Sequence, residues 1–371
     1  MMRLFRSLCS VLLLLLFPVI SSAGDVSAMQ VRTVDVSSDI GVFAVSTAGD
    51  RIAYGHAGLS VVSLAGDKSD LLFSDRTPLA LAWSQQGAQL AAVFQDGEQT
   101  QVVVYADSGE ALRSYRIDGR VTCLAWTPAA DILALAVQLR TFSFGIPLKA
   151  QLVHLDPQGS VRNETLFDTT LKKGTVASLG DELYRLYGFD LSPLGDDIVF
   201  TRFYDPPVIR RNLKVFLRHL PSGATRLLME LPTEAGSAVW SADSEQVVFS
   251  DGQQRTVRFD PWTLTSVRRW DLPGRFLAHS QAGPLLYIDG QLYQDGRLAA
   301  QMADGKAAFS RNGQKLIVAG KRQFSIYSFP EAAQSPLSQE QRQRLLTLRT
   351  LRAKELVTLD EYQRTRRELM K

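Results

Sequence analysis

Cysteine is nearly absent from this chain of 371 residues, which contains only Cys9 and Cys123. Small proteins with little core rely on several disulfides, and two cysteines cannot supply them, so a hydrophobic core must hold this chain together. Cys123 lies in the strand-like segment VTCLAW. A small buried apolar side chain is the simpler interpretation of this cysteine, and a reactive thiol is the alternative.

Histidines and catalytic motifs are scarce too. The chain has four histidines, none at ligand spacing from another: His56, His154, His219 and His279. It contains no Gly-x-Ser-x-Gly elbow, no phosphate-binding glycine loop, no His-Glu-x-x-His and no Cys-x-x-Cys-His. Acidic runs such as Gly195-Asp196-Asp197 fall in turns, where turn geometry accounts for them. We therefore predict no catalytic residues, no metal site and no cofactor.

Strong charge of one sign is also missing. The formal net charge is only +3, which gives no reason to expect a nucleic-acid partner. Hydrophobic residues make up 45% of the chain and charged residues 21%, which are ordinary values for a globular protein. The length is sufficient for one large domain or two modest ones.

The first 23 residues have the pattern of a secretory signal peptide. Arg3 and Arg6 precede an apolar run of ten residues, 11–20, and Ser-Ser-Ala at 21–23 provides a cleavage site. The run is too short for a membrane-spanning helix and contains Pro18. The pattern predicts cleavage after Ala23 and export to the periplasm, with an uncleaved anchor as the alternative.

A short repeat organises the rest of the sequence. Each copy is an apolar run ending in Ser or Thr, a turn, and a second apolar run, as in LSPLGDDIVF and WSADSEQVVF. The hydroxyl residues of the seven copies are Ser46, Ser84, Thr127, Ser192, Ser241, Ser280 and Ser310. Two further strand-like runs follow each copy, such as 101–106 and 111–117. Four antiparallel strands per unit predict a β-propeller blade.

The sequence therefore predicts an all-β chain, a seven-bladed β-propeller of four-stranded antiparallel blades, over residues 24–330. The seventh copy is followed by too few strands, and residues 30–36 (QVRTVDV) can supply the missing one. Such closure would remove the free sheet edges. Three copies place Trp before the hydroxyl residue, and packing between blades explains Trp83, Trp126 and Trp240 better than a cofactor site does.

The segments LSPLGDDIVF, FSRNGQKLIV and WSADSEQVVF resemble the WD-like repeats of TolB-type periplasmic β-propellers. The resemblance covers roughly 300 residues and implies a periplasmic propeller. The aspartate typical of the family turn is missing from most copies.

Residues 338–371 contain no Gly or Pro and follow a linker at 331–337. Capping boxes at Ser338-x-x-Gln341 and Thr358-x-x-Glu361 predict two helices. The segment 354–369 resembles a SHOCT module, a short C-terminal helical hairpin, which implies interaction or oligomerisation. Glu355 replaces the family's glycine and Tyr362 its phenylalanine.

This helical tail is basic, since nine basic and five acidic side chains give it a charge of +4. It could dock on the propeller, on an anionic membrane surface or on a second subunit, or it could be a solvated helical face. The residues proposed for such contacts are Arg349, Arg352, Tyr362, Arg366 and Arg367.

Three long connections interrupt the regular repeat, at 139–148, 169–186 and 204–212. Loops between second and third strands and links between blades emerge on the same face of a propeller. This face would gather aromatic and arginine side chains of the kind found at binding hot spots. The residues proposed to bind a partner are Phe142, Phe144, Tyr184, Tyr187, Tyr204, Arg210 and Arg211.

The sequence thus favours an exported, non-catalytic binding scaffold for a protein or envelope partner. Lineage-specific decoration is the other explanation of the long connections. The alternative function is a propeller enzyme, a hydrolase, lyase or dehydrogenase, with its site in the central channel. That function would require two or more titratable groups converging on one mouth of the channel.

Overall fold

The computed structural model describes most of the chain from residue 29 onwards. The residues described are 29–55, 57–64, 71–139, 146–171, 188–204, 212–231, 237–241, 244–250, 255–272, 274, 277–280, 285–329 and 338–369. The predicted signal peptide and the predicted linker at 331–337 lie outside these ranges. Within them, no helix is both long and apolar enough to cross a membrane.

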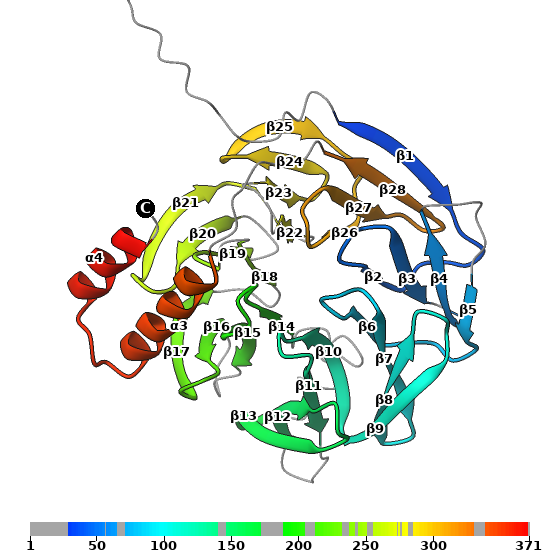
Figure 1. The fold of residues 1–371 in the computed structure, drawn as a ribbon, viewed down its shortest axis with the longest axis horizontal. Coiled ribbons are helices and arrows are strands. Elements are labelled where there is room, and N and C mark those ends of the chain that lie inside the picture. The colour runs from blue at the N-terminus through cyan, green and yellow to red at the C-terminus, as the bar shows by residue number, and fades with distance from the viewer. Residues whose placement is uncertain are drawn as a thin grey trace, which may run out of the picture.

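Seven four-stranded antiparallel sheets stand around a common centre, as the blades of a propeller (Figure 1). From the centre outwards, blade one contains β2 (Val42–Val45), β3 (Arg51–Gly55), β4 (Leu59–Ser63) and β5 (Leu71–Ser74). Blade two contains β6 (Ala80–Trp83), β7 (Gln89–Asp96), β8 (Gln99–Ala106) and β9 (Ala111–Asp118). Blade three contains β10 (Arg120–Trp126), β11 (Ile132–Leu139), β12 (Ile146–Leu155) and β13 (Val161–Leu171).

The next three blades have the same order. Blade four contains β14 (Phe189–Leu191), β15 (Asp197–Tyr204), β16 (Asn212–His219) and β17 (Ala224–Leu231). Blade five contains β18 (Ser237–Trp240), β19 (Val247–Ser250), β20 (Thr256–Asp260) and β21 (Thr265–Trp270). Blade six contains β22 (Leu277–His279), β23 (Leu285–Ile288), β24 (Gln291–Gln294) and β25 (Arg297–Gln301).

Blade seven closes the ring in the predicted way. Its inner strands are β26 (Lys306–Phe309), β27 (Lys315–Ala319) and β28 (Gln323–Ser328), and its outermost strand is β1 (Gln30–Asp35) from the other end of the chain. The register pairs Gln30 with Ser328 and Asp35 with Gln323. One sheet therefore joins both ends of the propeller, and the prediction for residues 30–36 is confirmed.

The repeated hydroxyl residues organise the first turn of the blades. In six of the seven copies the side-chain oxygen accepts a hydrogen bond from a backbone N–H four or five residues later, at 2.8–3.2 Å. A tight turn needs its amides satisfied before the next strand begins, and this hydroxyl supplies the acceptor. Glycine follows in the left-handed conformation where the turn demands it, as at Gly195 (φ 79°).

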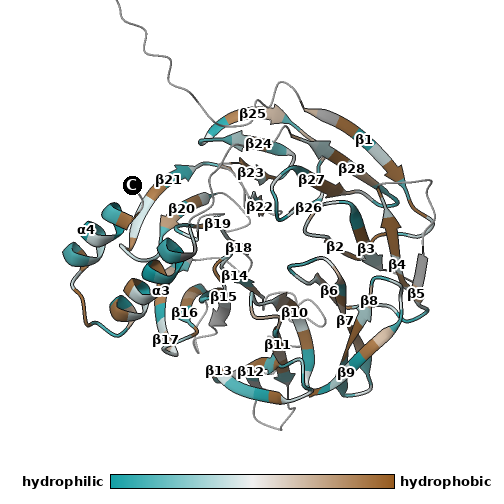
Figure 2. Cartoon of the chain, viewed as in Figure 1, coloured by the Kyte–Doolittle hydropathy of each residue, from teal (hydrophilic) through white to brown (hydrophobic). Residues whose placement is uncertain are grey.

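The core lies between the blades and not within one of them. Each of seven clusters of buried residues combines the side chains of two neighbouring blades, including the pair of blades seven and one. Figure 2 shows hydrophobic residues on the strands of every blade. The repeated tryptophans add hydrogen bonds between inner strands: Trp83, Trp126 and Trp240 donate from Nε1 to Ala44, Ala82 and Asp190 carbonyls at 3.2, 2.9 and 3.1 Å.

The predicted long connections are shorter than expected, because extended strands occupy part of them. β11 ends at Leu139 and β12 begins at Ile146, and β13 continues to Leu171. Tyr204 pairs with Asn212 at the end of the β15–β16 hairpin. The remaining connections, 140–145, 172–187 and 205–211, lie outside the described residues.

The C-terminal segment forms the two predicted helices, α3 (Gln339–Ala353) and α4 (Leu359–Leu369). Ser338 and Gln341 form a complete capping box at the start of α3. At the start of α4, the Thr358 hydroxyl accepts from the Glu361 N–H at 3.2 Å, and the Glu361 carboxylate accepts from the Thr358 N–H at 2.8 Å. We call α3, α4 and their connection the helical hairpin.

Candidate functional site

The helical hairpin lies against blades four and five (Figure 1). It contacts the turns between first and second strands, around Asp196 and Glu245, and the turn after β20, around Asp260. Turns between first and second strands and between third and fourth strands share one face of a propeller. The hairpin therefore occupies the face opposite the long connections of blades three and four.

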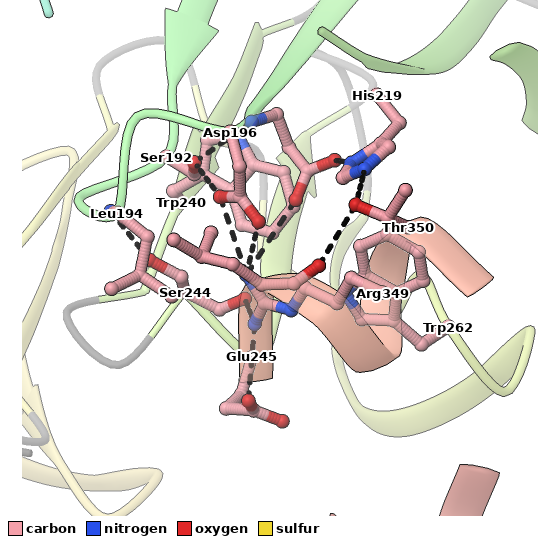
Figure 3. Close-up of polar contacts among 12 residues, drawn as sticks. Ser192, Leu194, Asp196, His219, Trp240, Ser244, Glu245, Trp262, Arg349 and Thr350 are labelled. Carbon is pink, nitrogen blue, oxygen red and sulfur yellow. Dashed lines mark hydrogen bonds and ion pairs between the residues drawn. The ribbon is translucent and has the colours of Figure 1, made fainter. Parts of the chain in front are cut away.

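Arg349 is the centre of this contact, and its side chain is completely buried (Figure 3). Its Nη1 lies 3.2 Å from Asp196 Oδ2 and 3.5 Å from Asp197 Oδ2. Its Nη2 lies 3.0 Å from Glu245 Oε1 and donates to the Ser244 carbonyl at 2.6 Å. Burial alone would lower the pKa of Arg349, but the carboxylates of Asp196, Glu245 and Asp197 raise it, so the guanidinium is charged.

The repeat turn of blade four positions the two aspartates. The Ser192 hydroxyl donates to Asp196 Oδ1 at 2.8 Å and accepts from the Asp197 N–H at 3.1 Å. Ser244 in blade five accepts from the Leu194 N–H at 3.1 Å, which ties the two turns together. The same motif that shapes every blade thus holds a pair of carboxylates in place for Arg349.

His219 extends the contact to the next residue of α3. Its Nδ1 lies 2.9 Å from Asp197 Oδ1 and its Nε2 lies 3.0 Å from Thr350 Oγ1. His219 is 1% exposed. Burial, followed by the charge of Asp196, raises the pKa of Asp197. The Thr350 hydroxyl also lies 2.9 Å from the Leu346 carbonyl, within its own helix. The chain Asp197–His219–Thr350 therefore joins the propeller to the hairpin.

Asp196, Asp197 and His219 offer three ligand atoms within 4.8 Å of one another, a donor set that a divalent cation could use. Arg349 already contacts both carboxylates with its guanidinium, and His219 points one nitrogen at Asp197 and the other at Thr350. A metal ion would have to displace the arginine. These residues fit an arginine receptor better than a metal site.

An aromatic layer covers the ion pairs. The Trp262 ring is fully buried, with the Arg349 guanidinium 5.2 Å from its centroid and the Tyr362 ring 5.9 Å away. His219 meets Trp262 edge-on at 6.0 Å. Arg366 then bridges Glu245 and Asp260, with Nη1 2.8 Å from Asp260 Oδ2. Cation–π contact and exclusion of water both strengthen the charge pairing beneath.

Three of the five residues predicted in the tail, Arg349, Tyr362 and Arg366, thus contact the propeller. Arg352 is half-buried, and its charge is one of the causes that lower the pKa of Arg226, after burial. Arg367 is exposed and borders a cavity of about 600 Å³ between α4 and blade five. Of the contacts predicted for the tail, the structure therefore contains the one in which the helical hairpin docks on the propeller.

Of the seven residues predicted to bind a partner, only Tyr204 belongs to the described part of the chain. It ends β15, and only its backbone is described. The other six, Phe142, Phe144, Tyr184, Tyr187, Arg210 and Arg211, lie outside the described residues. Their role in partner binding stays a prediction.

The interpretation of Gly195-Asp196-Asp197 as a simple turn was wrong, since both carboxylates bind Arg349. His219, Glu245 and Trp262 were also missed. A signal was available in the repeat itself, because the turns of blades four and five carry two acidic residues each and the other copies carry at most one. Two adjacent acidic turns and a basic tail in one chain are complementary.

Two titratable groups of the described inner strands, Asp190 and Cys123, bind backbone groups of a neighbouring blade. Asp190 Oδ2 accepts from the Trp240 N–H at 2.7 Å, and burial raises the pKa of this carboxyl to about 6. Cys123 Sγ accepts from the Phe189 N–H at 3.3 Å. Burial raises the pKa of the thiol to about 12, which argues against a reactive thiolate. These contacts hold blades together.

No family model matches the sequence. No curated protein matches it either. Among solved structures, a chain of a mitotic checkpoint complex is 14% identical with a TM-score of 0.56, covering 80% of this chain and 93% of that one. The Cps50 (Swd1) β-propeller domain from Myceliophteria thermophila is also 14% identical, with a TM-score of 0.53 and coverage of 80% and 98%. The ring therefore shares the β-propeller fold with solved structures.

This likeness establishes the fold and nothing more. As many as 1014 chains of known structure match, so the architecture is shared far too widely to indicate one activity. The resemblances to TolB-type repeats and to the SHOCT module stay predictions, since no family model supports them. Function must be argued from the surfaces of the molecule.

Proposed function

We propose that this protein is an exported, non-catalytic scaffold that binds a protein partner of the cell envelope. The binding face is the one that carries the long connections of blades three and four. Cleavage after Ala23 would deliver the chain to the periplasm. The helical hairpin lies on the opposite face, over blades four and five, so the two faces of the propeller have different tasks.

The observation that carries this proposal is the length of blade three. Its outer strands β12 and β13 have 10 and 11 residues, whereas β4 and β5 of blade one have 5 and 4. The extra length leads toward the face opposite the hairpin, where Ile146 pairs with Leu171. Long connections on a rigid blade are the usual place for recognition in repeat folds.

Replacing the connections 172–187 and 205–211 by short Gly-Ser links tests the binding face. A matched control replaces 65–70, the connection between β4 and β5, which belongs to the hairpin face. We expect a protein captured from an envelope extract to bind the purified mature chain and the control saturably, and to lose at least tenfold in affinity for the trimmed chain. Equal binding to all three would overturn the proposal.

Export is tested separately by fractionating producing cells and sequencing the mature N-terminus. A chain starting at Gly24 in the periplasmic fraction is the expected result. A chain that keeps its first residues and sediments with membranes would favour the uncleaved anchor.

A further inference from the structure

The helical hairpin has contacts between its own two helices. Gln341 Nε2 donates to the Leu369 carbonyl of α4 at 3.0 Å, and Leu369 packs in the same cluster as Leu348 of α3. Both helices begin with side-chain caps of their own. Such local satisfaction allows the two helices to stay together when their contact with the propeller changes.

The propeller presents this unit with a complementary receptor. We call it the acidic socket: the carboxylates of Asp196, Asp197, Glu245 and Asp260, together with the Trp262 ring that contacts the Arg349 guanidinium. Two guanidiniums, those of Arg349 and Arg366, fill it. Four carboxylates held together on blades four and five repel each other when the socket is empty, so an arginine-bearing helix is its natural occupant.

The hairpin does not dock on the blade from which the chain leaves. β28 ends at Ser328 in blade seven, and residues 330–337 connect it to α3. The ion pairs and the buried aromatic contacts of the hairpin are made with blades four and five. Each of these contacts would have the same geometry if the hairpin came from another molecule.

We propose that the acidic socket also accepts the helical hairpin of a second copy of this chain, so that two molecules exchange hairpins. Mutual exchange closes a twofold-symmetric dimer in which each socket contains the partner's Arg349 and Arg366. Docking on the propeller and self-association are then two uses of one contact. This inference is independent of partner binding at the opposite face.

Competition between the two uses depends on concentration. A short tether holds the chain's own hairpin at an effective concentration of roughly millimolar near its socket. The intact chain therefore closes on itself at micromolar concentration, and exchange becomes visible when one molecule has an empty socket and another has a free hairpin. Two complementary full-length variants create this situation.

The first variant carries Arg349→Ala and Arg366→Ala, which leave its socket empty. The second carries Asp196→Asn and Glu245→Gln, which leave its hairpin without a receptor. We expect each variant alone to have the mass of a monomer, and an equimolar mixture at 100 μM to contain a 1:1 complex. Hydrogen exchange should show protection of the α3 amides of the second variant only in the mixture.

A mixture that stays monomeric at 100 μM would overturn the proposal, and so would a complex that persists when Arg349→Ala is added to the second variant. Adding Arg344→Ala to the second variant is the matched control, because among the described residues Arg344 pairs with Glu340 of its own helix, and its removal should leave the complex intact. If the double substitution prevents folding of the first variant, Arg349→Gln alone replaces it and preserves more of the packing.

Discussion

Arg349 is the residue on which the position of the helical hairpin depends. Three carboxylates lie within 3.5 Å of its guanidinium, and all of them are buried. Buried ion pairs contribute little net stability over apolar packing, but removal of one partner is costly. The network therefore determines where the hairpin docks and contributes little to the net stability of the fold.

Substitution of Arg349 by alanine should release the hairpin. Three buried carboxylates would lose their cation, at a cost of about 3–5 kcal/mol. We expect protection of the α3 amides against hydrogen exchange to fall at least a hundredfold, with the propeller amides unchanged. Arg344→Ala serves as the control, because this exposed i,i+4 pair is worth about 0.3–0.5 kcal/mol. Equal protection in the two variants would contradict the assignment.

Asp190 should give the propeller a measurable pH dependence. Burial raises the pKa of its carboxyl in the folded state to about 6, above the value of 3.8 that an unperturbed aspartate has. Between these values the folded protein retains a proton that the unfolded chain has lost, so stability falls as pH rises from about 4 to 6.

Asp190→Asn removes this titration and should flatten the curve by on the order of 2 kcal/mol, measured by urea unfolding between pH 4 and 7. The amide oxygen of asparagine can still accept from the Trp240 N–H. Asp107→Asn, the same substitution at an exposed position, is the control. If Asp190→Asn has the same slope as the unsubstituted protein, the Asp190 carboxyl is already ionised in the folded protein at low pH. Asp197, whose pKa burial also raises, contributes to any slope that remains.

At the scale of the blade, the element that repeats is an inner strand fastened to its neighbour. Tryptophan at the end of β6, β10 and β18 donates to a carbonyl of the preceding blade's inner strand. β6 and β18 have only four residues each. The indole thus supplies both apolar area and a hydrogen bond at the junction between blades.

Trp126 and Trp270 separate these two contributions. Trp126→Phe leaves the Ala82 carbonyl without its 2.9 Å hydrogen bond, and we expect a loss of about 1–3 kcal/mol. Trp270 is similarly buried, but within the described contacts its Nε1 has no hydrogen-bond partner. Trp270→Phe should therefore cost less than half as much in urea unfolding. Equal losses would mean that the indole acts through packing alone.

At the scale of the whole molecule, stability depends on closure of the ring. β1 covers the edge of β28 in blade seven, and Val34 reaches the core shared by blades seven and one. A propeller without this strand would expose a sheet edge and an open junction. Both faces also depend on closure, since the hairpin and the long connections belong to blades that the ring holds in order.

Two substitutions in β1 test closure. Val34 is 1% exposed and Val31 is 58% exposed on the same strand. Val34→Asp should place a charge in the core, so that the protein unfolds at a much lower temperature or aggregates. Val31→Asp should change the melting temperature by no more than a few degrees. A folded, monomeric Val34→Asp variant would show that closure by β1 is dispensable.

The repeat, read by itself, determined the architecture. Local physics acts within about 45 residues: a hydroxyl that satisfies a turn, alternating apolar residues, and a capping box four residues long. These features predicted seven blades, closure by residues 30–36 and both helices. The partners within turns, hairpins and caps are close in the sequence, so the spacing of residue types contains the information. Closure by residues 30–36 followed from the strand that the seventh repeat lacks, although its partner in β28 is far away in the sequence.

Only the tertiary structure decided where the hairpin docks and what the acidic turns do. Arg349 meets Asp196 across 153 positions and Glu245 across 104, and Thr350 meets His219 across 131. No periodicity links such residues, because the ring brings them together only once all the blades have closed. The sequence showed the charges of both partners, and the fold determined which charge faces which.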